Sequence, residues 1–319
     1  MKIKPFVISV ALFVAAISAL NTRAVFSSAP NIILRFPTNN IGDVLRINGG
    51  FSYKYETTLL QPAQGAIAVQ PGVKLMLSLN PSIKDNLAAL AKLDPTPIYG
   101  ITFLYTPFDD KDIDHILRFK NLRLVDLSDS DVSDAGAAKL ANLPNLECLI
   151  LRHVNINGSC LSKLTGLKNL KYLYLGWNDL KAGELAAVKK MPALEDLQLT
   201  KTHLRDADMA SLQGATNIQR LVLMEEHLLT DKSIPYIKTL KNLNSLDVRQ
   251  TGITASGLVQ LKSMDLKSLK LESRSYSDQD KAKIKAAFPK AKIYYTNKMK
   301  NKLKIYEEVT GEQLEGFGK

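Results

Sequence analysis

The sequence is poor in the residues that most often carry covalent or metal chemistry. Its 319 residues include two cysteines, four histidines and one tryptophan. Two cysteines exclude the dense disulfide scaffold that holds many small exported domains together. Beyond the first 20 residues, no uncharged apolar run is long enough to cross a membrane as a helix. Acidic residues are outnumbered, 31 against 42 Lys and Arg, and the formal net charge of +11 favours acidic partners or anionic surfaces.

The signature motifs of common enzyme classes are also missing. The sequence contains no G-x-S-x-G, no H-E-x-x-H, no C-x-x-C and no glycine-rich phosphate loop after a strand. Serine, aspartate and glutamate are plentiful, but they show no catalytic spacing. We therefore expect a protein that is not an enzyme and that carries no cofactor and no metal.

The first 24 residues have the order of a secretory signal peptide. Lys2 and Lys4 precede an apolar run over residues 6–20, and small residues follow up to Ala24. The run of 15 residues is shorter than the roughly 20 that a membrane-spanning helix requires. We expect either cleavage or retention as an N-terminal anchor, and the protein is then secreted, periplasmic or associated with the cell envelope.

A period of 24 residues dominates the chain from residue 97 onward. Units aligned on L-x-x-L-x-L begin at positions 97, 121, 145, 169, 193, 217, 242 and 265. In residues 173–175 (LYL), alternation puts the leucines on one face of a short strand and the tyrosine on the other. Residues 134–143 (DAGAAKLANL) have helical spacing and strong helix formers. One unit cannot bury its leucines, so we expect the units to stack around a continuous core.

Each unit continues roughly as x-x-T-x-I-T-D-x-G-L-x-x-L, and in this form it resembles the leucine-rich repeat. The resemblance implies an α/β solenoid, with short parallel strands on the concave side and helices on the convex side. The T-x-I-T-D-x-G-L form is similar to a bacterial and F-box-associated subclass with true convex helices. More loosely, the order IGDVLRI, AQGAIAVQPGVKLMLSL and then the repeats resembles secreted leucine-rich-repeat proteins of planctomycete-type bacteria.

Repeat arrays need caps, because their terminal units expose apolar faces. Residues 25–72 contain short strand-like runs bounded by Gly, Pro and Asn, so we expect a small β-rich lead-in that caps the array. Residues 73–96 have the pattern of an imperfect capping repeat, and residues 97–289 are expected to form the leucine-rich repeats that the resemblance implies. Residues 290–319 are expected to give a closing strand and a basic tail. The lysines between residues 278 and 304 are either a solvated surface or a docking patch for anions.

The cysteines and histidines can each be interpreted as structural residues or as functional ones. Cys148 falls on the concave strand and Cys160 in the convex helix of the same unit, so we do not expect a bond between these opposite faces. Asp179, His203 and His227 share one column of the repeat, and such a set resembles zinc ligands. We favour the other interpretation, a solvated turn position that accepts any polar residue.

The residues between the leucines of each strand should form the concave surface. In the middle units this surface is apolar and aromatic with a basic rim, and Tyr, Trp and Arg dominate interface hot spots. On this hypothesis the tyrosines are free for a partner, and alanine in place of Tyr172, Tyr174 and Trp177 leaves the fold intact. The opposing interpretation is that the aromatic side chains only stack between strands and stabilise the sheet. The predicted partner-binding residues are Ile150, Arg152, Tyr172, Tyr174, Trp177, Arg220, Val222, Met224 and Arg249.

The sequence thus predicts an exported recognition module that binds a protein through its concave face. The alternative is a binder of glycans or anionic polymers at the cell envelope, since Tyr and Trp suit sugar rings and the lysine-rich end suits acidic polymers. Nucleic acid is not an expected partner, because few aromatic residues interleave with those lysines. Membrane attachment is expected only if the N-terminal segment is retained.

Overall fold

The computed structural model describes residues 30–48, 56–103, 105–181 and 183–296. The predicted signal segment at residues 1–24 lies outside these ranges, and so does the part from residue 297 onward of the closing strand and basic tail predicted for residues 290–319. No helix in the described ranges is long and apolar enough to cross a membrane.

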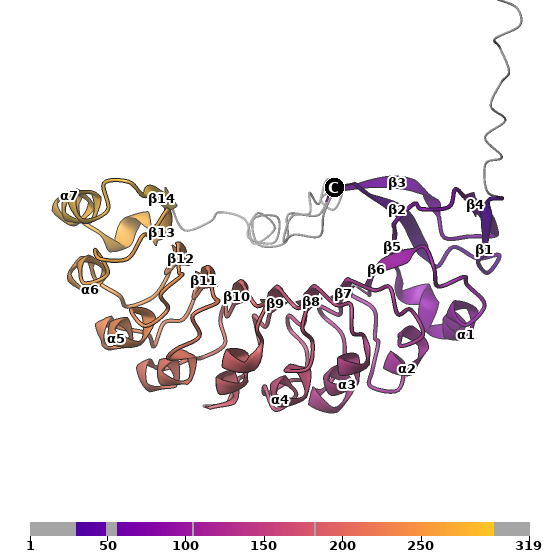
Figure 1. Ribbon diagram of the computed structural model, residues 1–319, viewed down its shortest axis with the longest axis horizontal. Coiled ribbons are helices and arrows are strands. Elements are labelled where there is room, and N and C mark those ends of the chain that lie inside the picture. Colours follow the sequence, from indigo (N-terminus) through magenta and orange to yellow (C-terminus); the bar gives the residue numbers. More distant parts are fainter. Residues whose placement is uncertain (1–29, 49–55, 104, 182, 297–319) are drawn as a thin grey trace, which may run out of the picture.

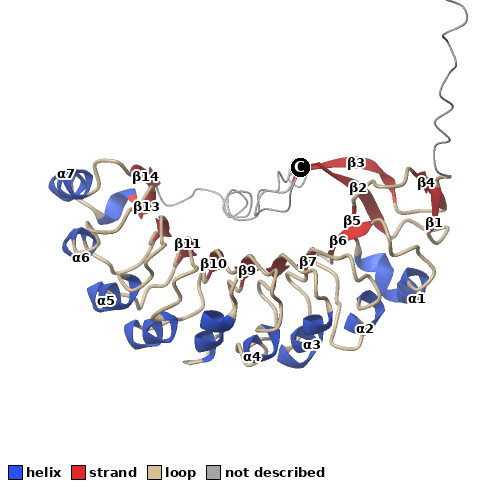
Figure 2. Ribbon diagram, viewed as in Figure 1, coloured by secondary structure: helices blue, strands red, loops and turns tan. Residues whose placement is uncertain are grey.

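The described chain forms a curved array with strands along its inner side and helices along its outer side (Figures 1 and 2). A 12-stranded sheet runs the length of the array in the order β14-β13-β12-β11-β10-β9-β8-β7-β6-β5-β2-β3. From β5 to β14 every neighbouring pair is parallel. These strands are β5 (Leu75–Leu79), β6 (Ile98–Thr102), β7 (Leu124–Asp126), β8 (Cys148–Ile150), β9 (Tyr172–Tyr174), β10 (Asp196–Gln198), β11 (Arg220–Val222), β12 (Ser245–Asp247), β13 (Ser268–Glu272) and β14 (Lys292–Thr296).

The β-rich lead-in is confirmed, and it extends the repeat sheet directly. Strand β2 (Gly42–Asn48) pairs antiparallel with β5 on one side and with β3 (Glu56–Pro62) on the other. Strands β1 (Ile32–Arg35) and β4 (Ala66–Val69) form a separate antiparallel pair. The lead-in therefore ends the parallel array with two antiparallel strands. The α/β leucine-rich-repeat solenoid expected from the sequence is confirmed.

The convex side consists of short helical segments, and not all of them are α-helical. The α-helices are α1 (Leu87–Leu90), α2 (Ile113–Ile116), α3 (Asp134–Lys139), α4 (Leu161–Leu164), α5 (Ile234–Ile237), α6 (Ala255–Val259) and α7 (Asp278–Ala287). The 3-10 segments are η2 (Pro81–Asn86), η3 (Leu140–Asn142), η4 (Glu184–Lys190), η5 (Asp206–Leu212), η6 (Asp231–Ser233) and η7 (Ser273–Ser275). The expectation of α-helices in every repeat is thus wrong for the units that begin at residues 169 and 193.

Side-chain capping also differs between repeats, although α2, α4 and α5 are α-helical without such a cap. Ser133, Thr254 and Ser277 each accept a hydrogen bond from the first turn of the α-helix that follows. The units with 3-10 helices have Lys181 and Arg205 at the same position, and neither η4 nor η5 has a side-chain cap. Side-chain oxygens at this position satisfy the otherwise unpaired N–H groups that begin a helix.

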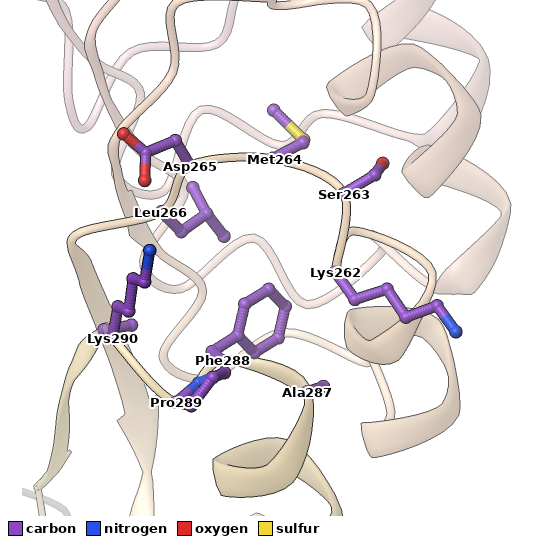
Figure 3. Close-up of a pocket in the computed structure, with 10 residues that line it drawn as sticks. Lys262, Ser263, Met264, Asp265, Leu266, Ala287, Phe288, Pro289 and Lys290 are labelled. Carbon is purple, nitrogen blue, oxygen red and sulfur yellow. The ribbon is translucent and has the colours of Figure 1, made fainter.

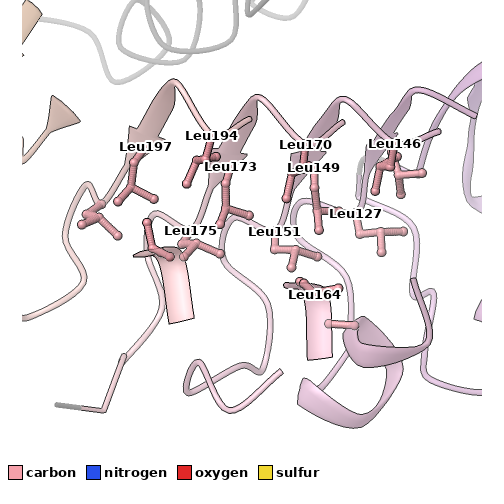
Figure 4. Packing of buried hydrophobic residues seen from close by; sticks show 14 of the residues in the cluster. Leu127, Leu146, Leu149, Leu151, Leu164, Leu170, Leu173, Leu175, Leu194 and Leu197 are labelled. Atoms are coloured by element: carbon pink, nitrogen blue, oxygen red, sulfur yellow. The ribbon is translucent and has the colours of Figure 1, made fainter. Parts of the chain in front are cut away.

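The core is a ladder of leucines between the strands and the helices (Figure 4). Leu149, Leu173 and Leu197, the central residues of β8, β9 and β10, pair in register and are fully buried. Many units begin with an asparagine whose side-chain amide bonds to the backbone of the preceding unit. For example, the Asn145 amide donates to the carbonyl of Lys120, and the Asn169 amide donates to that of Pro144. Each repeat is thereby bonded to the one before it.

Candidate functional site

The one-to-one register turns the concave side into straight columns of side chains. One column runs through Cys148, Tyr172, Asp196 and Arg220, because these residues pair as direct partners in successive strands. The next column runs through Ile150, Tyr174, Gln198 and Val222. The placement predicted for these residues on the strand faces is confirmed. Side chains two residues apart share a face of a strand, so both columns face away from the leucine core.

An apolar cluster occupies the concave side at the amino-terminal half of the array. We call it the concave cluster, and its buried members are Ile47, Met76, Leu124, Cys148, Ile150 and Tyr174, with Leu45, Tyr99 and Tyr172 packed against them. Val222 and Met224 form a separate pair further along. Strand β10 lies between the two groups and presents Asp196 and Gln198. The structure therefore brings Ile150, Tyr172 and Tyr174 together, while Val222 and Met224 stand apart.

The expectation that Tyr174 is free for a partner is wrong. Its side chain lies on the concave side as predicted, but only 1% of its surface is exposed, whereas Tyr172 is half-buried. The reason is lateral packing: Tyr174 sits against Ile150 and Cys148, within the cluster that extends to β2. Burial raises the pKa of both tyrosine hydroxyls.

Two of the predicted arginines are held by aspartates of the same face. Arg220 donates to Asp196 at 2.6 Å across neighbouring strands. Arg249 donates to Asp247 with two nitrogens, Nε to Oδ1 at 2.9 Å and Nη2 to Oδ2 at 2.7 Å. Asp196, Asp247 and Arg249 are all buried. Burial raises the pKa of Asp196, and the charge of Arg220 opposes this increase. The face therefore contains oriented ion pairs beside its apolar cluster.

Trp177 and Arg152 form the rim of the concave side where the strands end. The Arg152 guanidinium lies 4.9 Å from the centre of the Trp177 ring, which is a cation–π contact. Trp177 is half-buried and Arg152 is buried. In the two preceding repeats, Nδ1 of His153 lies 2.6 Å from Oδ1 of Asp129. This rim places an aromatic ring beside a charge just beyond the carboxyl end of β9.

The two cysteines lie on opposite faces, as predicted. Both are free and buried, Cys148 within the concave cluster and Cys160 within the leucine core. Burial raises the pKa of both thiols, which opposes their ionisation and reaction.

The column of Asp179, His203 and His227 was the candidate metal site. In the structure, His203 lies 3.4 Å from Asp179. Within the described ranges, no group of three or more His, Cys, Asp or Glu side chains could hold a metal ion.

The lysine-rich end is partly described, and several of its lysines have partners. Lys281 lies 3.4 Å from Asp278 and 5.7 Å from the Tyr295 ring, and Lys292 lies 5.1 Å from the Tyr294 ring.

A cavity of about 290 Å³ opens near the lysine-rich end, between the loop before β13 and the end of α7 (Figure 3). The Phe288 ring, Met264 and Lys290 line it. This cavity belongs to the end of the array and is not part of the concave cluster.

No family model matches the chain, and no curated protein matches it. Among solved structures it is similar to an internalin from Listeria monocytogenes, with 20% sequence identity and a TM-score of 0.45. The similarity covers 67% of this chain and 62% of the internalin chain.

Sequence reasoning missed the part of the site that the lead-in, the capping repeat and the first repeat supply. Ile47 and Leu45 come from β2, Met76 from β5 and Tyr99 from β6. The alternation in residues 75–79 (LMLSL) already places Met76 opposite the leucines, so extending the repeat by one unit would have found it. The contribution of β2 depends on its antiparallel pairing with β5. No local pattern in the sequence indicates that pairing.

Proposed function

We propose that this protein is an exported, non-enzymatic recognition module that binds a protein partner through the concave side of its solenoid. One observation carries the proposal: apolar, aromatic and ion-paired side chains gather on β8 to β12, where a solenoid offers an extended concave surface. Hot spots of protein interfaces are rich in Tyr, Trp and Arg. The proposed binding surface comprises Ile150, Arg152, Tyr172, Tyr174, Trp177, Arg220, Val222, Met224 and Arg249. Its half-buried members Tyr172, Trp177 and Arg220 contact the partner, and the buried Tyr174 supports them from beneath.

The ion pairs favour a protein over an anionic polymer. Asp196 and Asp247 place negative charge directly beside Arg220 and Arg249, so this face is not uniformly basic. A polyanion binds best to an uninterrupted field of positive charge. A folded or extended polypeptide can match alternating charges and apolar groups on one surface.

The test is capture of a partner from an envelope extract at two salt concentrations, with the full chain as bait. The informative variant is Tyr172→Ala with Trp177→Ala, because both side chains are only half-buried. The matched control is Lys189→Ala with Lys190→Ala on η4, at the convex side. We expect a protein that the wild type and the control retain and the variant loses. Retention of polysaccharide alone, released by salt from all three baits, would contradict the proposal.

A further inference from the structure

The concave side of β7 to β12 is buried to an unusual degree for an open sheet. Ile150 is 2% exposed, and Tyr174, Gln198 and Val222 are each 1% exposed. No described helix or strand lies over this side of these strands (Figures 1 and 2). Parallel sheets occur almost only with both faces covered. This face is therefore built to pack against a further segment of polypeptide.

Polar groups at the centre of the face indicate the chemistry of that segment. Within the part of the chain that the structure describes, neither the nitrogen nor the oxygen of the Gln198 amide has a hydrogen-bond partner. The same holds for the Thr200 hydroxyl, although both residues are 1% exposed. Buried polar groups without partners are rare and destabilising. An extended peptide presents N–H and C=O groups along its length and suits such a position. The concave cluster on one side and Val222 with Met224 on the other suit apolar side chains of the same peptide.

Cationic side chains on this face, two of them paired with aspartates, offer hydrogen-bond donors to carboxylates of that segment. Arg152, Arg220, Arg249 and Lys270 lie on the concave side within a run of six successive repeats. Arg220 and Arg249 are oriented by Asp196 and Asp247. A guanidinium group carries five N–H donors in a planar fork that matches carboxylates. An acidic peptide with spaced apolar residues therefore fits the face.

We propose that the concave face binds the chain's own C-terminal segment, residues 305–319 (IYEEVTGEQLEGFGK). This segment carries four glutamates, at positions 307, 308, 312 and 315, and its apolar residues are Ile305, Tyr306, Val309, Leu314 and Phe317. The glutamates face Arg152, Arg220, Arg249 and Lys270. The apolar residues pack on the concave cluster and on Val222 and Met224.

The position where the described chain ends makes this contact reachable. Strand β14 ends at Thr296, which pairs with Glu272 at the carboxyl edge of the sheet. From β14 to β8 there are six strand spacings of about 4.8 Å, or roughly 29 Å in total. The 23 residues after Thr296 extend over as much as about 75 Å. The first nine or so of them suffice to bring residue 305 to β8 or β9.

Carbodiimide crosslinking of the unmodified full chain tests the contact directly, since it joins a lysine to a carboxylate in contact with it. We expect, in the monomer fraction, a crosslink between Lys270 and one of the glutamates at 307, 308, 312 or 315. Lys139 and Asp114, which are 2.9 Å apart on neighbouring repeats, provide the internal control. If the control crosslink forms but no crosslink from Lys270 to these glutamates is detected, the proposal is overturned. So would a Lys270 crosslink found only in covalent dimers, which would assign the face to a second copy.

A second measurement uses Cys148, which lies in the concave cluster, against Cys160 in the leucine core. Changing the four glutamates to Gln should raise the alkylation rate of Cys148 several-fold and leave Cys160 unchanged. Changing Lys298, Lys300, Lys302 and Lys304 to Gln is the matched control and should leave both rates unchanged. An unaltered Cys148 rate in the glutamate variant would contradict the proposal. Neither measurement involves a protein partner, so this proposal and the proposed function can fail separately.

Discussion

Asp231 caps the helix of the next repeat through Thr254. Its carboxylate accepts the Thr254 N–H at 2.8 Å and the Thr254 hydroxyl at 2.6 Å. Asp206 makes the same two bonds to Thr230, with matching distances. The Asp that follows the helix-capping position of one repeat thus fixes the capping Thr of the following repeat. Neighbouring repeats are coupled through this contact as well as through their leucines.

Removal of the Asp231 carboxylate should therefore weaken the array. We expect Asp231→Ala to lower the free energy of unfolding by about 1–2 kcal/mol, because a cap and two hydrogen bonds to a charged acceptor are lost. Urea unfolding followed by circular dichroism measures the change. Asp131→Ala, at an exposed carboxylate, is the control. Equal losses for the two variants would show that Asp231 contributes nothing specific.

Gly257 makes room for the same carboxylate. A Cβ atom at this position would lie 2.0 Å from Oδ1 of Asp231, far inside van der Waals contact. We expect Gly257→Ala to destabilise the protein by about 2 kcal/mol, as overpacking does elsewhere. In the double variant with Asp231→Ala the overlap is gone, so the combined loss should be smaller than the sum of the single losses.

The control for this prediction is Gly166→Ala. A Cβ atom there meets nothing within 4 Å, so stability should stay constant or rise by up to about 1 kcal/mol. Additive losses for Gly257→Ala and Asp231→Ala would contradict the steric explanation.

The repeat period determined most of what the sequence could predict. A fixed spacing of leucines places the strands, their register and the face of each side chain, because stacking leaves one arrangement that buries every leucine. Cys148, Tyr172, Asp196 and Arg220 therefore fall into one column as expected. Burial on the concave side was predicted incorrectly for Tyr174, because it depends on packing between units and on the lead-in strand β2.

The local sequence pattern also did not predict the backbone conformation just after the strands. Asp129, His153, Trp177, Lys201, Glu225 and Gln250 share one column, and all of them have positive φ, between 49° and 62°. Such residues are usually Gly or Asn, and neither type occurs in this column. Tertiary structure imposes the left-handed turn in each of these six repeats. It also turns Trp177 toward Arg152.

The two tyrosines of β9 should respond differently to truncation. Tyr174 is 1% exposed within the concave cluster, and we expect Tyr174→Ala to lower the free energy of unfolding by about 3 kcal/mol. Tyr172 is half-buried, so Tyr172→Ala should lower it by about 1 kcal/mol or less. Urea unfolding of both variants at one pH gives the comparison. A small loss at Tyr174 would show that its burial does not reflect tight packing.

The pH dependence of stability should reveal the buried carboxyl of Asp126. This residue is 2% exposed, and Oδ1 accepts from the N–H and hydroxyl of Ser128 at 2.9 and 2.6 Å. Burial raises the pKa of Asp126, and the Ser128 hydrogen bonds and the charge of Arg152 only partly oppose it. A raised pKa means that the folded state binds the proton more tightly than the unfolded state. Its stabilising contribution is present below the ordinary pKa of 3.8 and is lost as the pH rises through the folded value.

Asp126→Asn keeps an oxygen acceptor for Ser128 but cannot ionise. The difference in unfolding free energy, variant minus wild type, should therefore increase between pH 3.5 and pH 7, because only the wild type must bury a charge at the higher pH. Urea unfolding at a series of pH values measures this difference. Asp131→Asn, at an exposed carboxyl, is the matched control. If the Asp126→Asn and wild-type curves stay parallel over the whole range, ionisation of Asp126 is not coupled to folding.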